Sequence, residues 1–578
     1  MPDPRPVPSP QEALTSARRG RLLTEAVAGP PPPTTSKGRR RRLAHAPDMQ
    51  TPTLDGGERL RVIDALICVL DGVYAHLPAK RAAYASNPVQ ALTLLRRRSG
   101  DMSAAEFHLA ITAIMTGLRD AHTRYIGPSK LRGHVAALPF LVEQYGPADN
   151  PSFMVSKTNP EAIDDPTFVD GVELLAWNGI PFARAVEIYA DRETGGRPDS
   201  RRTRALESLT FRALDYGPPP DEEWVMVGYR SKRKDREIRL PWRVIAPGKA
   251  GTAATPASRA ALKLAVDPAA EAVRRAKKLQ FAPELWRADN EHSPVASART
   301  PKPSPRKGTD WIDTPMQDTL AARALTKSMG YLRIWSFDVG DDDAFLDEVA
   351  RLLGLLPQDG LLVDLRSNPG GLVWAAERML QLFTDTPIEP TRFCLAATPL
   401  MRQMAESPFN RLELEAWSNS LQDAVSSGEQ YSQPLPLTDP AWCNDRGRYY
   451  RGPAVAIVDA NTYSSGDLFA AGWVDHGIGP LVSVGQATGG GGANVWTGNQ
   501  VRDALFGTEH EFPVLPGGTA FTLAIRRAVR SGMSDGIPIE DLGIAGIPYD
   551  MTRNDLLHHN RDLFAFCADL LATLDPNN

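Results

Sequence analysis

Two short turns in the second half of the chain combine residue types that can carry out acyl-transfer chemistry. The first is the Asn-Pro-Gly-Gly turn at 368–371, which follows the apolar run 361–365. Adjacent glycines adopt positive φ angles and bring backbone N–H groups together, as an oxyanion hole requires. The second is Ser-Ser-Gly-Asp at 464–467, which follows the apolar run 454–458. A serine between a strand and a helix presents its hydroxyl near the positive end of the helix dipole.

Each turn also has a simpler explanation. An isolated Asn-Pro-Gly-Gly sequence is most often an ordinary tight turn, and Ser or Asp before a helix is a common N-cap. A serine nucleophile also needs a base, and the base needs a group that orients it. Among ten histidines, His122 lies in a polar, threonine-flanked turn, whereas His476 falls in the helix expected after Ser464. The residue pattern alone leaves both histidines open as the base.

Strand–helix–strand units must position these two turns. Apolar strands are expected over 331–335, 361–365 and 454–458, and each is followed by an amphipathic helix or a helix start. Such alternation predicts a parallel sheet with helical crossovers. In open α/β sheets, ligands bind beyond the carboxyl ends of the strands, which is where both turns fall. The sequence therefore predicts an α/β catalytic core over 311–578.

His122 is expected directly after an amphipathic helix. Ser103 and Glu106 have the spacing of a capping box, in which a hydroxyl and a carboxylate satisfy free amides at a helix start. Apolar residues then recur at three- and four-residue steps, which indicates one buried face: Phe107, Ile111, Ile114, Met115 and Leu118. We therefore expect a helical domain over 56–150 that carries His122.

The rest of the chain divides by composition. Residues 1–55 are rich in proline and arginine, and they predict a disordered tail because they bury too little apolar surface to offset ordering entropy. Residues 168–243 show short strand-like runs with glycine turns, which predict a small, mostly β module. The Ala/Pro/Lys/Arg-rich residues 245–310 predict a linker or surface insertion with one helix over 269–281.

Composition excludes several classes of function. A formal net charge of −4 over 578 residues gives no electrostatic reason to expect nucleic-acid binding. The four cysteines are widely spaced, with no CxxC pair, which argues against a disulfide scaffold or a structural zinc site. No apolar run reaches the ~18–20 residues that a membrane span needs, and the first residues lack the apolar core of a secretory signal. The expectation is a cytoplasmic protein without cofactor or metal.

Considered together, the two turn regions resemble the core of the S41 serine peptidases, the tail-specific, C-terminal-processing and tricorn-type proteases. The likeness lies in Gly360–Gly371 and Pro453–Ala470, and it continues through the glycine run to Gly536–Ile544. It covers most of residues 100–240 and 311–560. The resemblance implies a ClpP/crotonase-like α/β core, with a parallel sheet and helices.

The same resemblance implies roles for individual residues. Processing proteases of the family pair their serine with a lysine from the glycine-rich stretch, and here that stretch, 488–494, contains no lysine. Instead, Leu-Arg-Asp-Ala-His at 118–122 matches the histidine element of the tricorn-like and chlamydial-type branch. The implied triad is therefore Ser464 as nucleophile, His122 as base and Glu540 as the orienting carboxylate.

The resemblance also implies an oxyanion hole and a second binding module. The backbone N–H of Ser465 would donate to the oxyanion together with Gly370 or Gly371, and the choice between the glycines stays open. Asp170–Gly179 resembles part of the peptide-binding PDZ module that many S41 proteins carry. A PDZ-like module adds a peptide as a β-strand. Because its usual carboxylate-binding glycine loop is not evident, a purely structural β domain is an equal alternative.

The predicted function is a serine endopeptidase that cleaves protein or peptide substrates through an acyl-enzyme intermediate. The alternative is a catalytically silent S41-like protein that binds peptides or other ligands. A crotonase-like enzyme ranks last, because no specific motif supports it. Some members of the family are zymogens, which raises the hypothesis that residues 1–55 or 245–310 restrict access to the site. The oligomeric state is not predicted.

Overall fold

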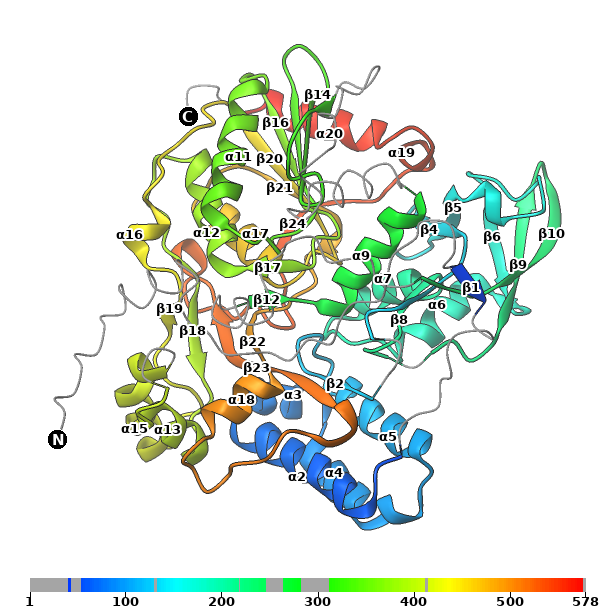
Figure 1. The fold of residues 1–578 in the computed structure, drawn as a ribbon. Coiled ribbons are helices and arrows are strands. Elements are labelled where there is room, and N and C mark those ends of the chain that lie inside the picture. The colour runs from blue at the N-terminus through cyan, green and yellow to red at the C-terminus, as the bar shows by residue number, and fades with distance from the viewer. Residues whose placement is uncertain are drawn as a thin grey trace, which may run out of the picture.

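The computed structural model shows a large α/β core, with a β-rich module beside it and a helical domain at its base (Figure 1). The structure describes residues 40–42, 53–128, 132–217, 219–245, 264–281, 311–410 and 414–574. Most of the tail predicted over 1–55 lies outside these residues. Where it is described, β1 (Arg40–Arg42) pairs antiparallel with β11 (Arg243–Ile245), so the prediction of a disordered tail is wrong there. β11 pairs with β3 (Val135–Ala137) on one side, and its other edge offers backbone hydrogen-bond partners to β1. The composition of the tail gives no sign of this edge.

The N-terminal helices turn apolar faces toward the core. The predicted capping box is confirmed: Ser103 Oγ accepts from the N–H of Glu106, and the Glu106 carboxylate accepts from the N–H of Ser103. The chain then passes through His122 into β2 (Arg124–Ile126). The four helices are α2 (Gly56–Gly72), α3 (Leu77–Tyr84), α4 (Pro88–Arg98) and α5 (Ala104–Thr116).

The β-rich module begins earlier than predicted. The boundaries at 150 and 168 are wrong, because β4 (Phe140–Tyr145) and β5 (Ser152–Thr158) form a hairpin in the same sheet as the later strands. β4 buries only Phe140 and Val142, so its alternating pattern is weak. The expected strands over 224–229 and 238–242 are found in β9 and at the end of β10.

The module contains two sheets and two helices. One sheet has the order β10-β9-β6-β5-β4, with β7 paired to β6, and the other has the order β1-β11-β3-β8. Their remaining elements are β3 (Val135–Ala137), β6 (Glu173–Trp177), β7 (Ile180–Pro181), α6 (Phe182–Ala190), α7 (Pro198–Ser208), β8 (Phe211–Ala213), β9 (Trp224–Ser231) and β10 (Lys234–Pro241).

Residues 264–281 are packed against the core. β12 (Leu264–Val266) pairs antiparallel with β17 (Gly370–Leu372), and α9 (Pro268–Phe281) matches the predicted helix. Arg274 on α9 is buried between Glu271, at 2.8 Å, and Asp318, at 3.0 Å. The prediction of a linker or surface insertion is therefore wrong for this segment, since its charged residues pair with one another in the interior.

The core is a seven-stranded sheet in the order β13-β14-β15-β16-β20-β21-β24. The four strands from β15 to β21 pair in parallel, and the outer strands are antiparallel. The strands are β13 (Trp311–Ile312), β14 (Leu320–Ala324), β15 (Gly330–Ile334), β16 (Leu361–Asp364), β20 (Ala454–Asp459), β21 (Leu481–Ala487) and β24 (Ala545–Tyr549).

Helices cover both faces of this sheet, which explains its nearly continuous apolar strands. Leu361 and Val363 pack on the side of α11 (Asp342–Leu355), α12 (Val373–Leu380) and α17 (Ser465–Asp475). Leu362, between them, packs on α20 (Arg561–Ala572). The candidate serine turn lies between β20 and α17, at the carboxyl end of a parallel strand, as expected.

A second sheet attaches the helical domain to the core. Its central strand, β23, pairs with β18, β22 and β2, so the strand just after His122 is fixed to the C-terminal half of the chain. The remaining elements are β18 (Arg392–Leu395), α13 (Pro399–Glu406), α15 (Ser418–Ser427), β19 (Leu435–Pro436), α16 (Pro440–Cys443), β22 (Ala493–Thr497), α18 (Gly498–Ala504), β23 (Ala520–Val529) and α19 (Arg553–Leu557).

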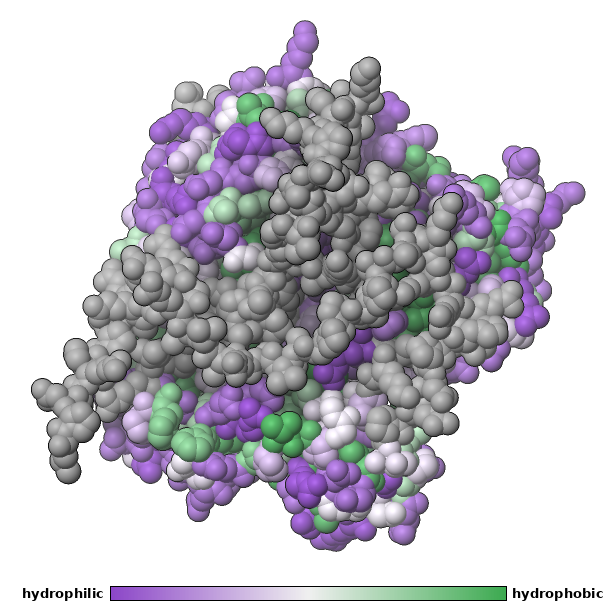
Figure 2. All heavy atoms as spheres, viewed as in Figure 1, coloured by the Kyte–Doolittle hydropathy of each residue, from purple (hydrophilic) through white to green (hydrophobic). Residues whose placement is uncertain are grey.

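The face drawn in Figure 2 is mostly polar where its residues are described. In the view of Figure 2, apolar residues lie scattered among hydrophilic ones. Within the described residues, no single helix is long and apolar enough to cross a membrane; α2 and α3 reach that length and composition only as a pair bent by 92°.

Candidate active site

The structure brings His122 and Ser464 together, although 342 residues separate them in the chain. His122 Nε2 lies 2.8 Å from Ser464 Oγ, within hydrogen-bond distance, and both residues are fully buried. Ser464 precedes α17 with φ of 64° and ψ of −122°, a backbone conformation that non-glycine residues rarely adopt. Backbone strain of this kind concentrates at functional sites. At this distance a histidine ring nitrogen can accept the proton of a serine hydroxyl.

A buried carboxylate holds the serine turn in this conformation. Asp467 accepts hydrogen bonds from the backbone N–H of Ser464 (2.7 Å), Gly490 (3.0 Å) and Gly491 (2.9 Å), and from the Thr488 hydroxyl. Burial raises the pKa of Asp467, and the four donors oppose that rise. A Cβ at Gly491 would lie 2.2 Å from the Tyr463 ring, so only glycine lets this loop reach Asp467. The glycine-rich stretch thus supports the serine turn and supplies no base.

His476, the other candidate base, has a structural position. It caps the end of α17, where its Nε2 accepts from the N–H of Glu389 at 2.8 Å, and its Nδ1 lies 3.0 Å from the carbonyl oxygen of Gly472. Both ring nitrogens are therefore engaged away from Ser464.

The surroundings of His122 favour the neutral imidazole. Burial lowers its pKa to about 4; the Asp120 and Asp267 carboxylates oppose this, whereas Arg204 and Arg124 add to it. Nε2 faces the serine hydroxyl, and Nδ1 is buried with no hydrogen-bond partner among the described residues. A neutral imidazole is the form that can accept a proton from Ser464.

Asp120 is a supporting residue that the sequence reasoning did not assign. Its Oδ1 accepts from the N–H of His122 at 2.8 Å, and its Oδ2 accepts from the hydroxyls of Tyr74 (2.9 Å) and Thr123 (2.8 Å). Burial opposes its ionisation, but His76, Lys80 and His122 lower its pKa to about 2. Asp120 therefore fixes the backbone of the base. The signal was present, since Asp120 belongs to the 118–122 element.

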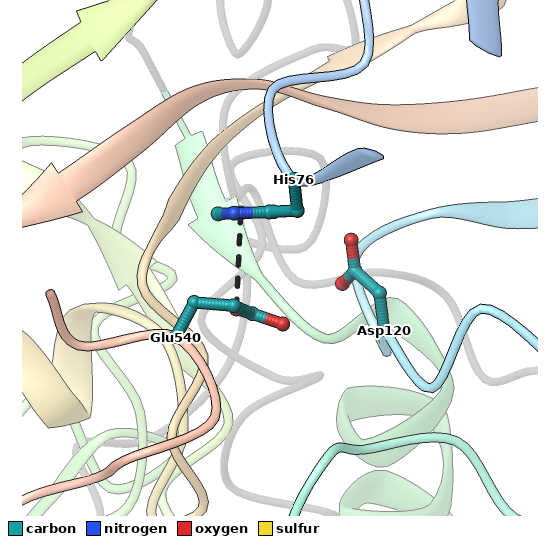
Figure 3. Close-up of side chains that lie close together, drawn as sticks. All are labelled: His76, Asp120 and Glu540. Atoms are coloured by element: carbon teal, nitrogen blue, oxygen red, sulfur yellow. Dashed lines mark ion pairs between the residues drawn. The ribbon is translucent and has the colours of Figure 1, made fainter. Parts of the chain in front are cut away.

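Glu540 lies in the same buried region but does not contact His122 directly. Its Oε1 accepts from Lys80 Nζ at 2.6 Å, and its Oε2 accepts from the N–H of Gly492 at 3.2 Å. His76 Nε2 lies 3.8 Å from Oε2, the contact dashed in Figure 3, where the side chains of His76, Asp120 and Glu540 converge. Burial lowers the pKa of His76 to about 3, which favours its neutral form. Of the three predicted triad residues, Glu540 alone is not brought into hydrogen-bond contact with its expected partner.

Lys80 organises this cluster, and no sequence signal pointed to it. Its side chain is fully buried and also contacts Asp541 Oδ1 at 2.5 Å. Burial disfavours its charge, but Glu540 and Asp541 outweigh burial and hold the pKa of Lys80 above its ordinary value. His76, Asp120 and Glu540 offer three metal-ligand atoms within 4.8 Å of one another. Because Lys80 already neutralises Glu540, we interpret the group as an ion-pair cluster.

The predicted oxyanion residues flank the serine. Ser465 is the first residue of α17, and the N–H of Tyr463 donates to the carbonyl of Asn368 at 2.9 Å, which holds the two turns side by side. The N–H of Gly370 already donates to Asn368 Oδ1 at 2.9 Å. A Cβ at Gly371 (φ 150°) would lie 1.8 Å from the Phe337 carbonyl carbon. Gly371 faces Ala265 of β12, so a strand of the chain itself lies across this edge.

Part of the chain is similar to known proteins. Residues 328–537 match the sequence model of peptidase family S41. A protein of Chlamydia pneumoniae, CPj1016/CpB1054, is 26% identical over 269 residues, which is 39% of this chain and 41% of that relative. The chain thus spans less than half of the length of the curated relative that it matches.

Solved structures share the fold over nearly the whole chain. The crystal structure of mature CPAF has a TM-score of 0.60 at 17% identity, and the match covers 89% of this chain and 98% of that one. Mature CPAF complexed with lactacystin gives a TM-score of 0.59 over the same shares. At this identity, the likeness shows a common fold.

Proposed function

We propose that the chain is a serine-type peptidase of family S41, whose sequence model matches residues 328–537. It hydrolyses peptide bonds of protein or peptide substrates with Ser464 and His122. The observation that carries the proposal is the 2.8 Å contact between His122 Nε2 and Ser464 Oγ. Fluorophosphonate labelling tests it, because such reagents modify activated serines. Stoichiometric labelling at Ser464 is expected; peptide binding without labelling would favour the catalytically silent alternative.

The proposed mechanism proceeds through an acyl-enzyme. His122 Nε2 takes the proton of Ser464 Oγ as the oxygen attacks the peptide carbonyl, and then gives it to the leaving amine. The N–H of Ser465 and the N–H of Gly371 stabilise the oxyanion; Gly371 is preferred because the N–H of Gly370 is engaged by Asn368. In the second half of the reaction, His122 Nε2 takes a proton from water as the water oxygen attacks the acyl carbonyl. His122 then gives that proton to Ser464 Oγ as the acyl group leaves.

The support of the base is proposed to be shared. Asp120 holds the backbone of His122 and faces it with a negative charge, which stabilises the imidazolium formed during attack. Glu540 acts through the cluster with Lys80 and His76, so we propose it as a positioning residue.

The β-rich module is proposed to be PDZ-like. The Asp170–Gly179 segment contains β6, which pairs with both β5 and β9 in the middle of the larger sheet. α6 packs against this sheet through Phe182, Ala185 and Val186. A sheet with a helix packed on it is compatible with strand addition by a peptide, and equally with a purely structural role.

The low pKa of His122 predicts the pH dependence of activity. Because the base works only when neutral, kcat/KM should be constant from pH 7 to about pH 5 and decrease toward lower pH with an apparent pKa near 4. Hydrolysis of an unfolded protein should be measured across this range, with circular dichroism at each pH to confirm folding. An inflection near the ordinary histidine pKa of about 6.5 would contradict the buried, neutral base.

Stability should respond to the same buried imidazole over a defined window. The pKa of His122 is about 4 in the folded protein and ordinary, about 6.5, in the unfolded chain. Between these values the unfolded chain binds more protons, so this residue makes the folded state less stable as pH falls from about 6.5 to about 4.

We propose that β12 restricts access to the site, as the zymogen hypothesis suggested for 245–310. β12 pairs with β17, which carries the proposed oxyanion glycine. Proline at position 265 removes a backbone donor and disfavours strand pairing. Ala265→Pro in the full chain should therefore increase the rate of hydrolysis, by about tenfold if the strand costs about 1.4 kcal/mol to displace. Ala265→Ser, which keeps the N–H, is the control; equal rates for both variants and wild type would remove the idea.

A further inference from the structure

Asp267, the residue that follows β12, places a buried carboxylate between two arginines beside the catalytic pair. Its Oδ2 accepts from Arg204 Nη1 at 2.5 Å and from Arg124 Nη2 at 3.4 Å. The two arginine side chains are only 8% and 10% exposed, and that of Asp267 is inaccessible. Although burial opposes its ionisation, the two guanidinium groups hold the pKa of Asp267 well below its usual range.

Both arginines contact residues that are next to His122 or Ser464 in the chain. Arg124 follows His122 by two residues, and its Nε donates to the carbonyl of Ala121 at 2.8 Å. The guanidinium carbon of Arg204 lies 4.6 Å from the centre of the Tyr463 ring, next to Ser464 in the chain. The arginines are therefore held by the catalytic residues' own neighbours, independently of the segment that carries Asp267.

The backbone of β12 and Asp267 pairs with β17 in the way that a bound peptide strand would. Ala265 is opposite Gly371, and the N–H of Asp267 donates to the carbonyl of Pro369 at 2.9 Å. A substrate peptide paired with β17 in the same register would carry a side chain to the arginines two residues after the residue that faces Gly371. That position is close to the bond that Ser464 would attack.

The surroundings require an anion at this position. A cavity of about 100 Å³ adjoins α9 and is lined by Arg124, Arg192, Arg204 and Arg212, together with Glu193 and Glu207. Glu207 is already paired with Lys277. Within the part of the chain that the structure describes, Nε of Arg204 is buried and has no hydrogen-bond partner, so its guanidinium has a further donor for a carboxylate. Removing Asp267 without replacement would leave two buried guanidinium charges unpaired, which is costly.

We propose that Arg204 and Arg124 form a carboxylate-binding subsite for an acidic side chain of the peptide substrate, a subsite that Asp267 occupies in the structure. The inference rests on the proposed peptidase function and assigns its substrate class. Arginine suits this role because its planar fork binds carboxylates in two-point fashion and keeps its charge when buried. A substrate with Asp or Glu at this position exchanges one carboxylate for another, whereas a neutral side chain leaves the arginines unpaired.

The test uses two peptides of identical sequence that differ only by Asp or Asn at the subsite position, with amidated C-termini to exclude a terminal carboxylate. In the wild-type full chain and in its Ala265→Pro variant, kcat/KM for the Asp peptide should be at least tenfold higher than kcat/KM for the Asn peptide, as expected for a hydrogen bond to a charged group. Arg204→Met should reduce this ratio to near one. Arg212→Met, a cavity arginine outside the Asp267 contact, should keep the ratio.

Two outcomes overturn the inference. Equal kcat/KM for the two peptides in wild type, or a ratio unchanged by Arg204→Met, would assign Asp267 and Arg204 to holding α9 alone. Hydrolysis that depends on Ser464 but shows no acidic preference would leave the peptidase function standing and remove only the subsite. The absence of any Ser464-dependent hydrolysis would remove both.

A binding measurement keeps the inference testable if Arg204→Met fails to fold. In the Ser464→Ala full chain, the Asp peptide should bind about tenfold more tightly than the Asn peptide. Asp267→Asn should tighten binding of both peptides by a similar factor, because each peptide must displace the segment that carries Asp267. Isothermal titration calorimetry gives both affinities. Equal affinities of the unmutated Ser464→Ala chain for the two peptides, or affinities that Asp267→Asn leaves unchanged, would overturn the subsite.

Discussion

Replacing Ser464 with alanine is expected to reduce the turnover of an unfolded protein substrate by about 10⁵–10⁶-fold, the size of loss seen when a serine nucleophile is removed. The hydroxyl is the atom that forms the acyl-enzyme, and His122 is placed to accept its proton at 2.8 Å. The rate should be followed by release of fluorescent peptide fragments, and fluorophosphonate labelling should disappear in parallel. Full activity of Ser464→Ala would refute the proposed mechanism.

Two further variants locate the effect. His122→Ala should lose a similar factor, and the double variant Ser464→Ala/His122→Ala should lose little more than either alone, because the two side chains act as one unit. Ser465→Ala tests the assignment within the Ser-Ser pair. It keeps the backbone N–H proposed for the oxyanion hole, so its turnover should stay within about tenfold of wild type.

Replacing Lys80 with methionine is expected to lower the free energy of unfolding by about 3–5 kcal/mol, the cost of removing one partner from a buried ion pair. Lys80 is fully buried, and it is paired with Glu540 at 2.6 Å and Asp541 at 2.5 Å. Burial and the nearby Asp120 raise the pKa of Glu540 well above its usual value, and Lys80 is the neighbour that opposes this rise. Urea unfolding of the full chain, followed by circular dichroism, gives the free energy.

The control is a lysine–glutamate pair that is more exposed. Lys277 pairs with Glu207, and the two side chains are 29% and 19% exposed, so Lys277→Met should cost about 1 kcal/mol or less. The double variant Lys80→Met/Glu540→Gln should be more stable than the sum of the single changes predicts, because it removes both charges together. A Lys80→Met variant within 1 kcal/mol of wild type would show that the cluster is not a stabilising ion-pair network.

Local signals predicted the elements around the site well. The Ser103–Glu106 capping box, the strands at 331–335, 361–365 and 454–458, and the helix over 269–281 are all present. Each depends on residues within one or two turns of each other, so periodicity and capping chemistry are sufficient to find it. The pairing of Ser464 with His122 was inferred only through the family resemblance.

Errors in the prediction occurred where a segment's partner is distant in the chain. The arginines of β1 and the charged face of α9 are typical of solvated surface, yet β1 extends the sheet at β11, and Arg274 is buried with Glu271 and Asp318. Composition describes what a segment would do in water, and it carries no information about the surface against which that segment packs.

The sequence by itself therefore determined the strand–helix alternation, the two turns and the residue types able to act as nucleophile, base and acid. Only the tertiary structure decided which histidine meets Ser464, how Lys80 neutralises Glu540, and that Asp267 lies between Arg204 and Arg124. The physical reason is that residue types and local periods are properties of neighbouring residues. Hydrogen bonds and ion pairs in the interior instead depend on sheets that join segments hundreds of residues apart, as β23 joins β2 to the core.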